Sequence, residues 1–167
     1  NVVHYTLELQ DTAIGSRYDS CISGFFLGDL FARKSEIYDI VQELEGQLII
    51  KEYPTKSAAV STIKRHIDRL KQRDIAVDMI IVDYADLLRP QRNDREKRME
   101  LESIYEELRA LAQENECPLW TASQTNRSGL NAEVITMESI SEAFSKCFVA
   151  DFIFSLSRTI EDKTTNG

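Results

Sequence analysis

The sequence predicts an α/β fold in which helices cover a mostly parallel β-sheet. Short apolar runs alternate with stretches of helical periodicity along the 167 residues. The connections between successive runs are long enough for crossovers, which parallel strands require. The run at 79–82 contains no polar residue and ends at Asp83, as expected of a strand that is buried on both faces.

The chain begins with a strand that is followed by two helices. Residues 2–7 are rich in β-branched and aromatic side chains, which predicts a strand from the second residue onward. Thr12 is a candidate N-cap for an amphipathic helix that ends near Gly24. A second helix over 37–44 is expected to stop at Gly46, since glycine often ends helices.

The middle of the chain repeats this pattern of strand and helix. Residues 47–53 predict a strand that is closed by Pro54. Within 56–73 apolar side chains recur at helical spacing, which predicts a helix with one buried face. The apolar run at 79–82 is then the next strand.

The C-terminal part predicts further elements of both kinds. A long amphipathic helix is expected over 96–115 and a short strand over 118–123. A loop over 126–138, a short helix over 140–146 and a last strand over 148–156 complete the prediction. Because there is no linker, internal repeat or low-complexity tract, we expect residues 1–167 to belong to one domain.

The composition predicts a cytoplasmic protein with no membrane segment. No apolar stretch is long enough to span a bilayer, and the N-terminus lacks the pattern of a signal peptide. The three cysteines lie far apart, which argues against a disulfide framework or a zinc site. The net charge of −8 argues against a surface that coats nucleic acid as a whole, but it allows a local basic loop.

A polar side chain follows three of the predicted strands. These residues are Glu8, Asp83 and Gln124. Parallel strands end at one edge of the sheet, where α/β proteins bind ligands, so the three side chains are expected to converge. Nucleotide hydrolysis can use such a set. One carboxylate takes a proton from water, a second holds a magnesium ion through water, and an amide hydrogen-bonds the terminal phosphate.

Each of the three residues also has a purely structural interpretation. Glu8 could be a solvated acid at the start of a turn, and Asp83 could cap the next helix or turn. Gln124 could bond the backbone of the neighbouring loop. The occurrence of all three, in this order on a parallel-sheet pattern, favours the functional interpretation.

Several stretches resemble motifs of the DnaB-like replicative helicases. Residues 5–10 (YTLELQ) are similar to the strand that carries the S-L-E-M motif, and 80–88 (IIVDYADLL) resemble the Walker B segment. Residues 122–127 (ASQTNR) resemble L-S-Q-L-N-R, and 140–158 are similar to the region L-R-E-S…D-A-D-V-V-L-F-L-Y-R. Residues 50–55 resemble bacteriophage members. The resemblance implies a RecA-like P-loop NTPase fold, a three-layer sandwich.

The resemblance also implies a function and roles for the residues at the strand ends. It implies a helicase that couples ATP hydrolysis to movement along single-stranded DNA, with ATP and Mg2+ as cofactors. Glu8 becomes the general base and Asp83 the carboxylate of the magnesium shell. Gln124 becomes the sensor of the γ-phosphate, with Arg127 beside it. The partners implied are single-stranded DNA, further copies in a hexameric ring and a primase or helicase loader, in a bacterial or phage-infected cell.

Two features of the family pattern are missing from the sequence. It contains no G-x-x-x-x-G-K-[ST] loop to bind phosphates, and it ends at Gly167 before the basic residues that act across the subunit boundary. We therefore interpret the chain as a partial motor domain that lacks the phosphate-loop strand, and we expect it to be inactive by itself. We also expect an exposed sheet edge to favour pairing with another chain, as a dimer or another assembly.

Basic residues are concentrated in the connection that follows the Walker B-like strand. They are candidates for contacts with DNA phosphates, and a second candidate is the loop after Gln124. The alternative is a solvated loop with charge pairs along the next helix. The candidate DNA-binding residues are Arg89, Arg92, Arg95, Lys97, Arg98, Arg127, Ser128 and Asn131.

Two other functions remain compatible with the sequence. One is a recombination or clock-type ATPase of the RecA fold, and the other is a non-enzymatic RecA-fold scaffold or inhibitor. The S-Q-x-N-R form at 123–127 favours the helicase branch, because the corresponding strand of recombinases usually ends in N-Q.

Overall fold

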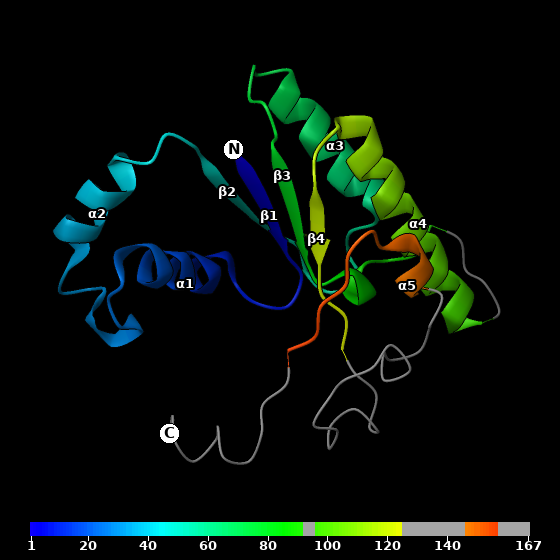
Figure 1. Cartoon of the computed structure of the whole chain (residues 1–167), viewed down its shortest axis with the longest axis horizontal. Helices are drawn as coiled ribbons and strands as arrows, with labels where there is room; N and C mark the ends of the chain where they lie inside the picture. Colours follow the sequence, from blue (N-terminus) through cyan, green and yellow to red (C-terminus); the bar gives the residue numbers. More distant parts are fainter. Residues whose placement is uncertain (92–95, 125–145, 157–167) are drawn as a thin grey trace, which may run out of the picture.

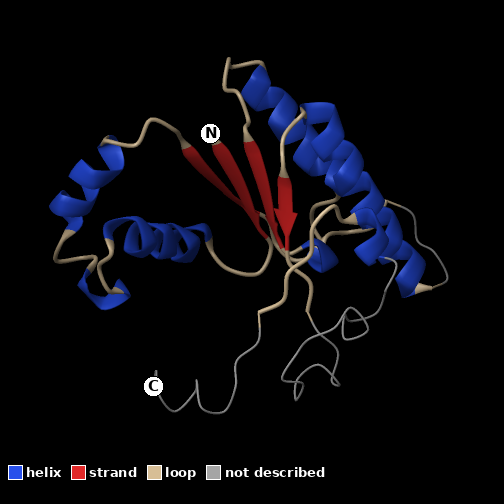
Figure 2. Ribbon diagram, viewed as in Figure 1, coloured by secondary structure: helices blue, strands red, loops and turns tan. Residues whose placement is uncertain are grey.

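The computed structural model describes residues 1–91, 96–124 and 146–156. Within this part it confirms an α/β fold built on a parallel sheet (Figures 1 and 2). The strands are β1 (Val2–Thr6), β2 (Leu48–Glu52), β3 (Met79–Asp83) and β4 (Leu119–Thr121). Their spatial order is β2-β1-β3-β4, and every neighbouring pair is parallel.

Helices lie on both sides of this sheet, as the alternating pattern predicts (Figure 1). On one side are α1 (Asp11–Ser23) and α2 (Lys34–Gln42), and on the other are α3 (Val60–Lys71) and α4 (Lys97–Asn115). The shorter elements are η1 (Leu27–Asp29), η2 (Ala85–Leu87) and α5 (Lys146–Val149). None of the described helices is both long and apolar enough to cross a membrane.

The hydrophobic core lies between the sheet and the helices α3 and α4. Ile80 and Val82 of β3 are fully buried there, among the apolar faces of both helices. Ile81, on the opposite face of the same strand, is only half-buried. The prediction of a strand buried on both faces is therefore correct for one face, because α1 and α2 cover the other less completely.

The boundaries of β1, β2 and β3 agree with the predicted strands to within one residue at each end, β4 is shorter than the predicted 118–123, and some helix starts differ. Gly24 ends α1 with a φ of 74°, in the left-handed region that glycine adopts without strain. Thr12 is not the N-cap, since α1 starts at Asp11 and is preceded by Gln10. The helix predicted over 37–44 starts earlier, at Lys34.

The predicted last strand over 148–156 is wrong. Lys146–Val149 form α5, and residues 150–156 belong to no described strand. Side chains hold this segment instead. Arg109 Nη2 of α4 donates to Asp151 Oδ1 at 2.7 Å. The rings of Trp120 and Phe154 pack edge to face, with their centroids 5.7 Å apart. An apolar run becomes a strand only where a neighbouring strand pairs with its backbone. The predicted loop at 126–138 and the predicted helix at 140–146, apart from Lys146, lie outside the described residues.

His66 of α3 makes stability depend on pH near neutrality. Its Nδ1 lies 2.9 Å from the hydroxyl of the buried Tyr5. Burial lowers the pKa of His66 from 6.5, and the positive charges of Lys51, Arg69 and Arg73 lower it further. The unfolded chain therefore binds a proton at a pH where the folded chain does not. We expect the free energy of unfolding to fall as the pH drops below about 6.5.

Urea unfolding at a series of pH values between about 7.5 and 5.5, above the range where carboxylates titrate, measures this effect. His66→Gln should reduce the slope of unfolding free energy against pH. His4, whose pKa is also lowered by burial, should maintain the remaining slope. An unchanged slope in His66→Gln would show that His66 has the same pKa in the folded and unfolded states.

Candidate functional site

The carboxyl ends of β1 and β3 lie side by side. Thr6 pairs with Asp83 in the parallel register, and the backbone N–H of Leu7 donates to the carbonyl of Asp83 at 2.9 Å. Glu8 follows directly and is exposed. The structure therefore brings two of the predicted site residues, Glu8 and Asp83, to the same edge of the sheet.

Gln124, the third predicted residue, reaches this edge beyond the end of β4. Its Nε2 donates to the hydroxyl of Tyr84 at 2.9 Å. The strands themselves are joined by Thr121, whose hydroxyl donates to the carbonyl of Val82 at 2.9 Å and accepts the N–H of Ala85 at 3.0 Å. These contacts fix the end of β4 against the end of β3.

Tyr84 lies where the three predicted residues meet, although the sequence analysis did not single it out. Burial raises the pKa of Tyr84, followed by the negative charges of Glu8 and Asp86, while the hydrogen bond from Gln124 lowers it and Asp83 adds a smaller increase. The phenol is therefore protonated near neutral pH. Its position directly after Asp83 is the signal that could have identified it.

Two further residues that the sequence analysis missed surround Asp83 on the side of α1. His4 Nε2 lies 4.0 Å from Asp83 Oδ2, and His4 Nδ1 lies 2.9 Å from the hydroxyl of Tyr18. Burial lowers the pKa of His4 and outweighs the opposing effect of Asp83, so the imidazole is neutral near pH 7. His4 could have been found from its spacing, because it lies two positions before Thr6, the last residue of β1, on the same face of the strand.

The Asp83 carboxylate fits a magnesium ion that is held through water. Its side chain is 36% exposed. The described residues contain no group of three or more His, Cys, Asp or Glu that could enclose a metal ion. Mg2+ usually keeps several water ligands and takes only one or two carboxylates. A single aspartate at the sheet edge therefore suits this ion better than an ion that needs a full set of protein ligands.

A buried polar cluster, also missed by the sequence analysis, lies behind Gln124. Lys146 Nζ lies 2.9 and 2.8 Å from the two carboxylate oxygens of Asp86. The hydroxyl of Tyr105 donates to Asp86 Oδ1 at 2.9 Å. Burial, and next the charge of Asp86, raise the pKa of Tyr105 well above its usual range. No sequence signal pairs Asp86 with Lys146, which follows 60 residues later.

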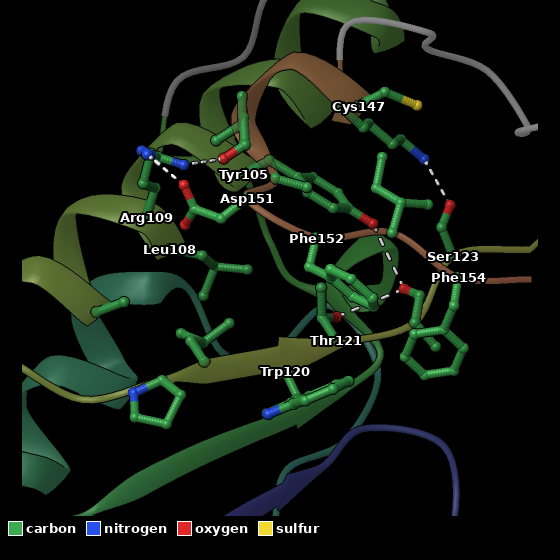
Figure 3. A pocket seen from close by; sticks show the side chains of 18 of the residues that line it. Tyr105, Leu108, Arg109, Trp120, Thr121, Ser123, Cys147, Asp151, Phe152 and Phe154 are labelled. Carbon is green, nitrogen blue, oxygen red and sulfur yellow. Dashed lines mark hydrogen bonds and ion pairs between the residues drawn. The ribbon is translucent and has the colours of Figure 1, made fainter. Parts of the chain in front are cut away.

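An apolar pocket of about 1020 Å³ lies beside this cluster, between α4, β4 and residues 146–156 (Figure 3). Trp120, Phe152 and Phe154 line it. Glu8, Asp83 and Gln124 are not among its lining residues. The strand-end site is therefore separate from this pocket.

The candidate DNA-binding residues are described only in part. Arg89, Lys97 and Arg98 are exposed, and the latter two begin α4. The backbone N–H of Arg89 donates to the carbonyl of Ala58 at 2.8 Å, which fixes the start of the basic connection. The other candidates lie outside the described residues: Arg92, Arg95, Arg127, Ser128 and Asn131.

Two known proteins are similar to this chain, one over most of its length and the other over less than half of it. The chain is 28% identical over 173 residues to the DnaB-like replicative helicase of Enterobacteria phage T4, covering 96% of this chain and 36% of that protein. It is 39% identical over 75 residues to the replicative DNA helicase DnaB of Geobacillus stearothermophilus, covering 44% of this chain and 16% of that protein. The chain thus spans well under half the length of these curated relatives.

A solved structure shares the fold. It is a DnaB-like replicative helicase, described together with its interactions with primase, and it matches 90% of this chain and 39% of its own. The TM-score is 0.75 at 15% identity, which supports the RecA-like fold.

The family model of the DnaB-like helicase C terminal domain matches residues 19–134. Asp83 and Gln124 lie within this range, and Glu8 precedes it. Since the model matches more than half of the sequence, the chain belongs to the family of DnaB-like helicase C-terminal domains.

Proposed function

We propose that this chain is part of an ATP-dependent replicative DNA helicase that moves along single-stranded DNA. The residues at the edge of its sheet would take part in ATP hydrolysis. The observation that carries the proposal is the convergence of Glu8, Asp83 and Gln124 around Tyr84 at one edge of a parallel sheet. Because the chain covers 36% of the phage T4 relative, the activity is proposed for the longer protein that contains these residues.

The three side chains have separate tasks in this proposal. Glu8 is exposed at the edge, where its carboxylate can take a proton from the attacking water. Asp83 would hold a magnesium ion through the water ligands of the ion, which would supply neutralising charge to the phosphates. Gln124 donates its amide to the γ-phosphate, and Arg127, outside the described residues, is proposed as a further nucleotide contact.

ATP binding also needs a phosphate-binding loop, which residues 1–167 do not contain. We propose that these contacts come from other residues of the longer protein, and that the 167-residue chain alone does not turn over ATP. Tests of activity therefore use the longer protein.

The proposed DNA contacts come from the exposed Arg89, Lys97 and Arg98, together with the basic residues outside the described part. Each phosphate contact contributes only about 0.7 to the salt slope for a single strand, so a ring of copies around one strand is needed for tight binding. We accordingly propose a hexameric assembly. A primase is proposed as a partner because a relative of the same fold is described with one; a helicase loader is the alternative.

Unwinding of a forked DNA duplex by the longer protein with ATP and Mg2+ tests this function. We expect ATP-dependent strand displacement, measured by fluorescence as the labelled strands separate. DNA-stimulated ATP hydrolysis without displacement would instead favour a recombination-type ATPase. A protein without any ATP hydrolysis would favour a scaffold or inhibitor.

A further inference from the structure

The buried ion pair of Asp86 and Lys146 joins the residues that follow β4 to those that follow β3. Lys146 Nζ also lies 3.2 Å from the hydroxyl of Ser123, which in turn donates to Asp86 Oδ2 at 3.4 Å. The side chain of Lys146 is 3% exposed and that of Asp86 is 18% exposed. Both charges are therefore largely removed from water and directed at each other.

Tyr105 completes this cluster from α4. Its hydroxyl bonds Asp86 and lies 3.4 Å from the carbonyl of Ala122, and Lys146 Nζ lies 5.3 Å from the centre of its ring. Figure 3 shows the Tyr105 hydroxyl directed toward the end of β4, near Thr121. The cluster therefore combines side chains from η2, α4, α5 and the segment after β4.

The cluster holds the backbone next to Gln124 through the preceding residue, Ser123. Ser123 contacts Asp86 and Lys146, and Gln124 is the next residue. On the side-chain side, Gln124 bonds Tyr84 at 2.9 Å. Each support includes one residue of the connection after β3, which is Asp86 on the backbone side and Tyr84 on the side-chain side. The position of the Gln124 amide relative to Asp83 thus depends on both supports.

Stability alone is a weak reason for a buried pair at this position. Apolar side chains of similar volume often stabilise a fold as well as a buried ion pair does. A second ion pair, between Arg109 and Asp151, already fastens the segment after α5 to α4 at 2.7 Å, closer to solvent. What the Asp86–Lys146 pair adds is a directed contact to Ser123, at the base of Gln124.

We propose that Asp86 and Lys146 are positioning residues that hold the Gln124 side chain at the position relative to Asp83 that ATP hydrolysis needs. This proposal rests on the proposed function, since it concerns the same strand-end site. The pair acts through Ser123 and does not contact the nucleotide. Loss of alignment at a reacting centre lowers kcat more than it weakens substrate binding.

The test compares variants of the longer protein. We expect Lys146→Met to lower kcat for ATP by about tenfold or more while KM changes less than about twofold. Asp86→Asn, which keeps the shape and removes the charge, is the second variant and should act in the same direction. Arg109→Met is the matched control, because it loosens the same segment without touching Ser123, and its kcat should stay near wild type.

A second comparison separates positioning from a general structural role. In a Gln124→Ala background, Lys146→Met should have less than about twofold further effect on kcat, since the residue it positions is gone. Equal losses in both backgrounds, or equal losses in Lys146→Met and Arg109→Met, would overturn the proposal.

Hydrogen exchange of the peptide that contains Ser123 and Gln124 gives a readout independent of activity. Its exchange should become faster in Lys146→Met and stay unchanged in Arg109→Met. Unchanged exchange in Lys146→Met would overturn the proposal even with a lower kcat. If the wild-type protein did not hydrolyse ATP, the proposed function would fail, and exchange would still decide whether the pair fixes Gln124.

Discussion

Replacing Glu8 with Gln in the longer protein is expected to reduce ATP hydrolysis by about a hundredfold or more, with ATP affinity changed by only a few-fold. Glutamine keeps the shape of the side chain at the exposed edge but cannot accept the proton of the attacking water. Phosphate release under saturating ATP measures kcat. Equilibrium titration with a fluorescent ATP analogue measures affinity.

Glu52→Gln is the matched control for this variant. Glu52 ends β2 in register with Thr6, so it is a carboxylate at the same edge, one strand further from Asp83. It is exposed and accepts the backbone N–H of Asp11 at 3.0 Å. We expect kcat within about twofold of wild type, because no proton transfer depends on it. Full turnover in Glu8→Gln would place the general base elsewhere.

Ile80→Ala is expected to lower the free energy of unfolding by about 2–5 kcal/mol. Ile80 has no exposed surface and packs in the core between β3 and the helices α3 and α4. Truncation leaves a cavity under the strand that carries Asp83. Urea unfolding followed by circular dichroism measures the loss.

Ile81→Ala, one position further along the same strand, is the control for this loss. It removes the same atoms from the opposite face, where Ile81 is half-buried. We expect less than about half the loss of Ile80→Ala, since less apolar surface returns to water. Equal losses would mean that the α1 side of the sheet is as well packed as the core.

The strands and the strand-end residues could be predicted because they depend on local patterns and on one general rule. Apolar runs such as 79–82 mark strands, and parallel strands place Glu8, Asp83 and Gln124 at one edge whatever their order in the sheet. This inference needs no knowledge of side-chain contacts.

The remaining parts of the site depend on distant contacts that no local pattern encodes. Lys146 faces Asp86 only because α5 packs beside α4, and 60 residues separate the two in sequence. Residues 148–156 have the composition of a strand, but whether they form one depends on a paired neighbour, which the described structure does not provide. Local propensity is therefore overridden by tertiary context at both places.

The hydrogen bond from Gln124 to Tyr84 engages one of the two N–H donors of the proposed sensor and leaves the other for a second acceptor. A γ-phosphate can accept this second N–H, or compete with the neutral phenol of Tyr84 for the first. Hydrogen bonds to charged acceptors are roughly twice as strong as those between neutral groups, so a γ-phosphate can win this exchange. A nucleotide without that phosphate leaves the amide with its original partner. Discrimination between ATP and ADP would then depend on whether the second N–H finds a γ-phosphate, while Tyr84 fixes the orientation of the amide.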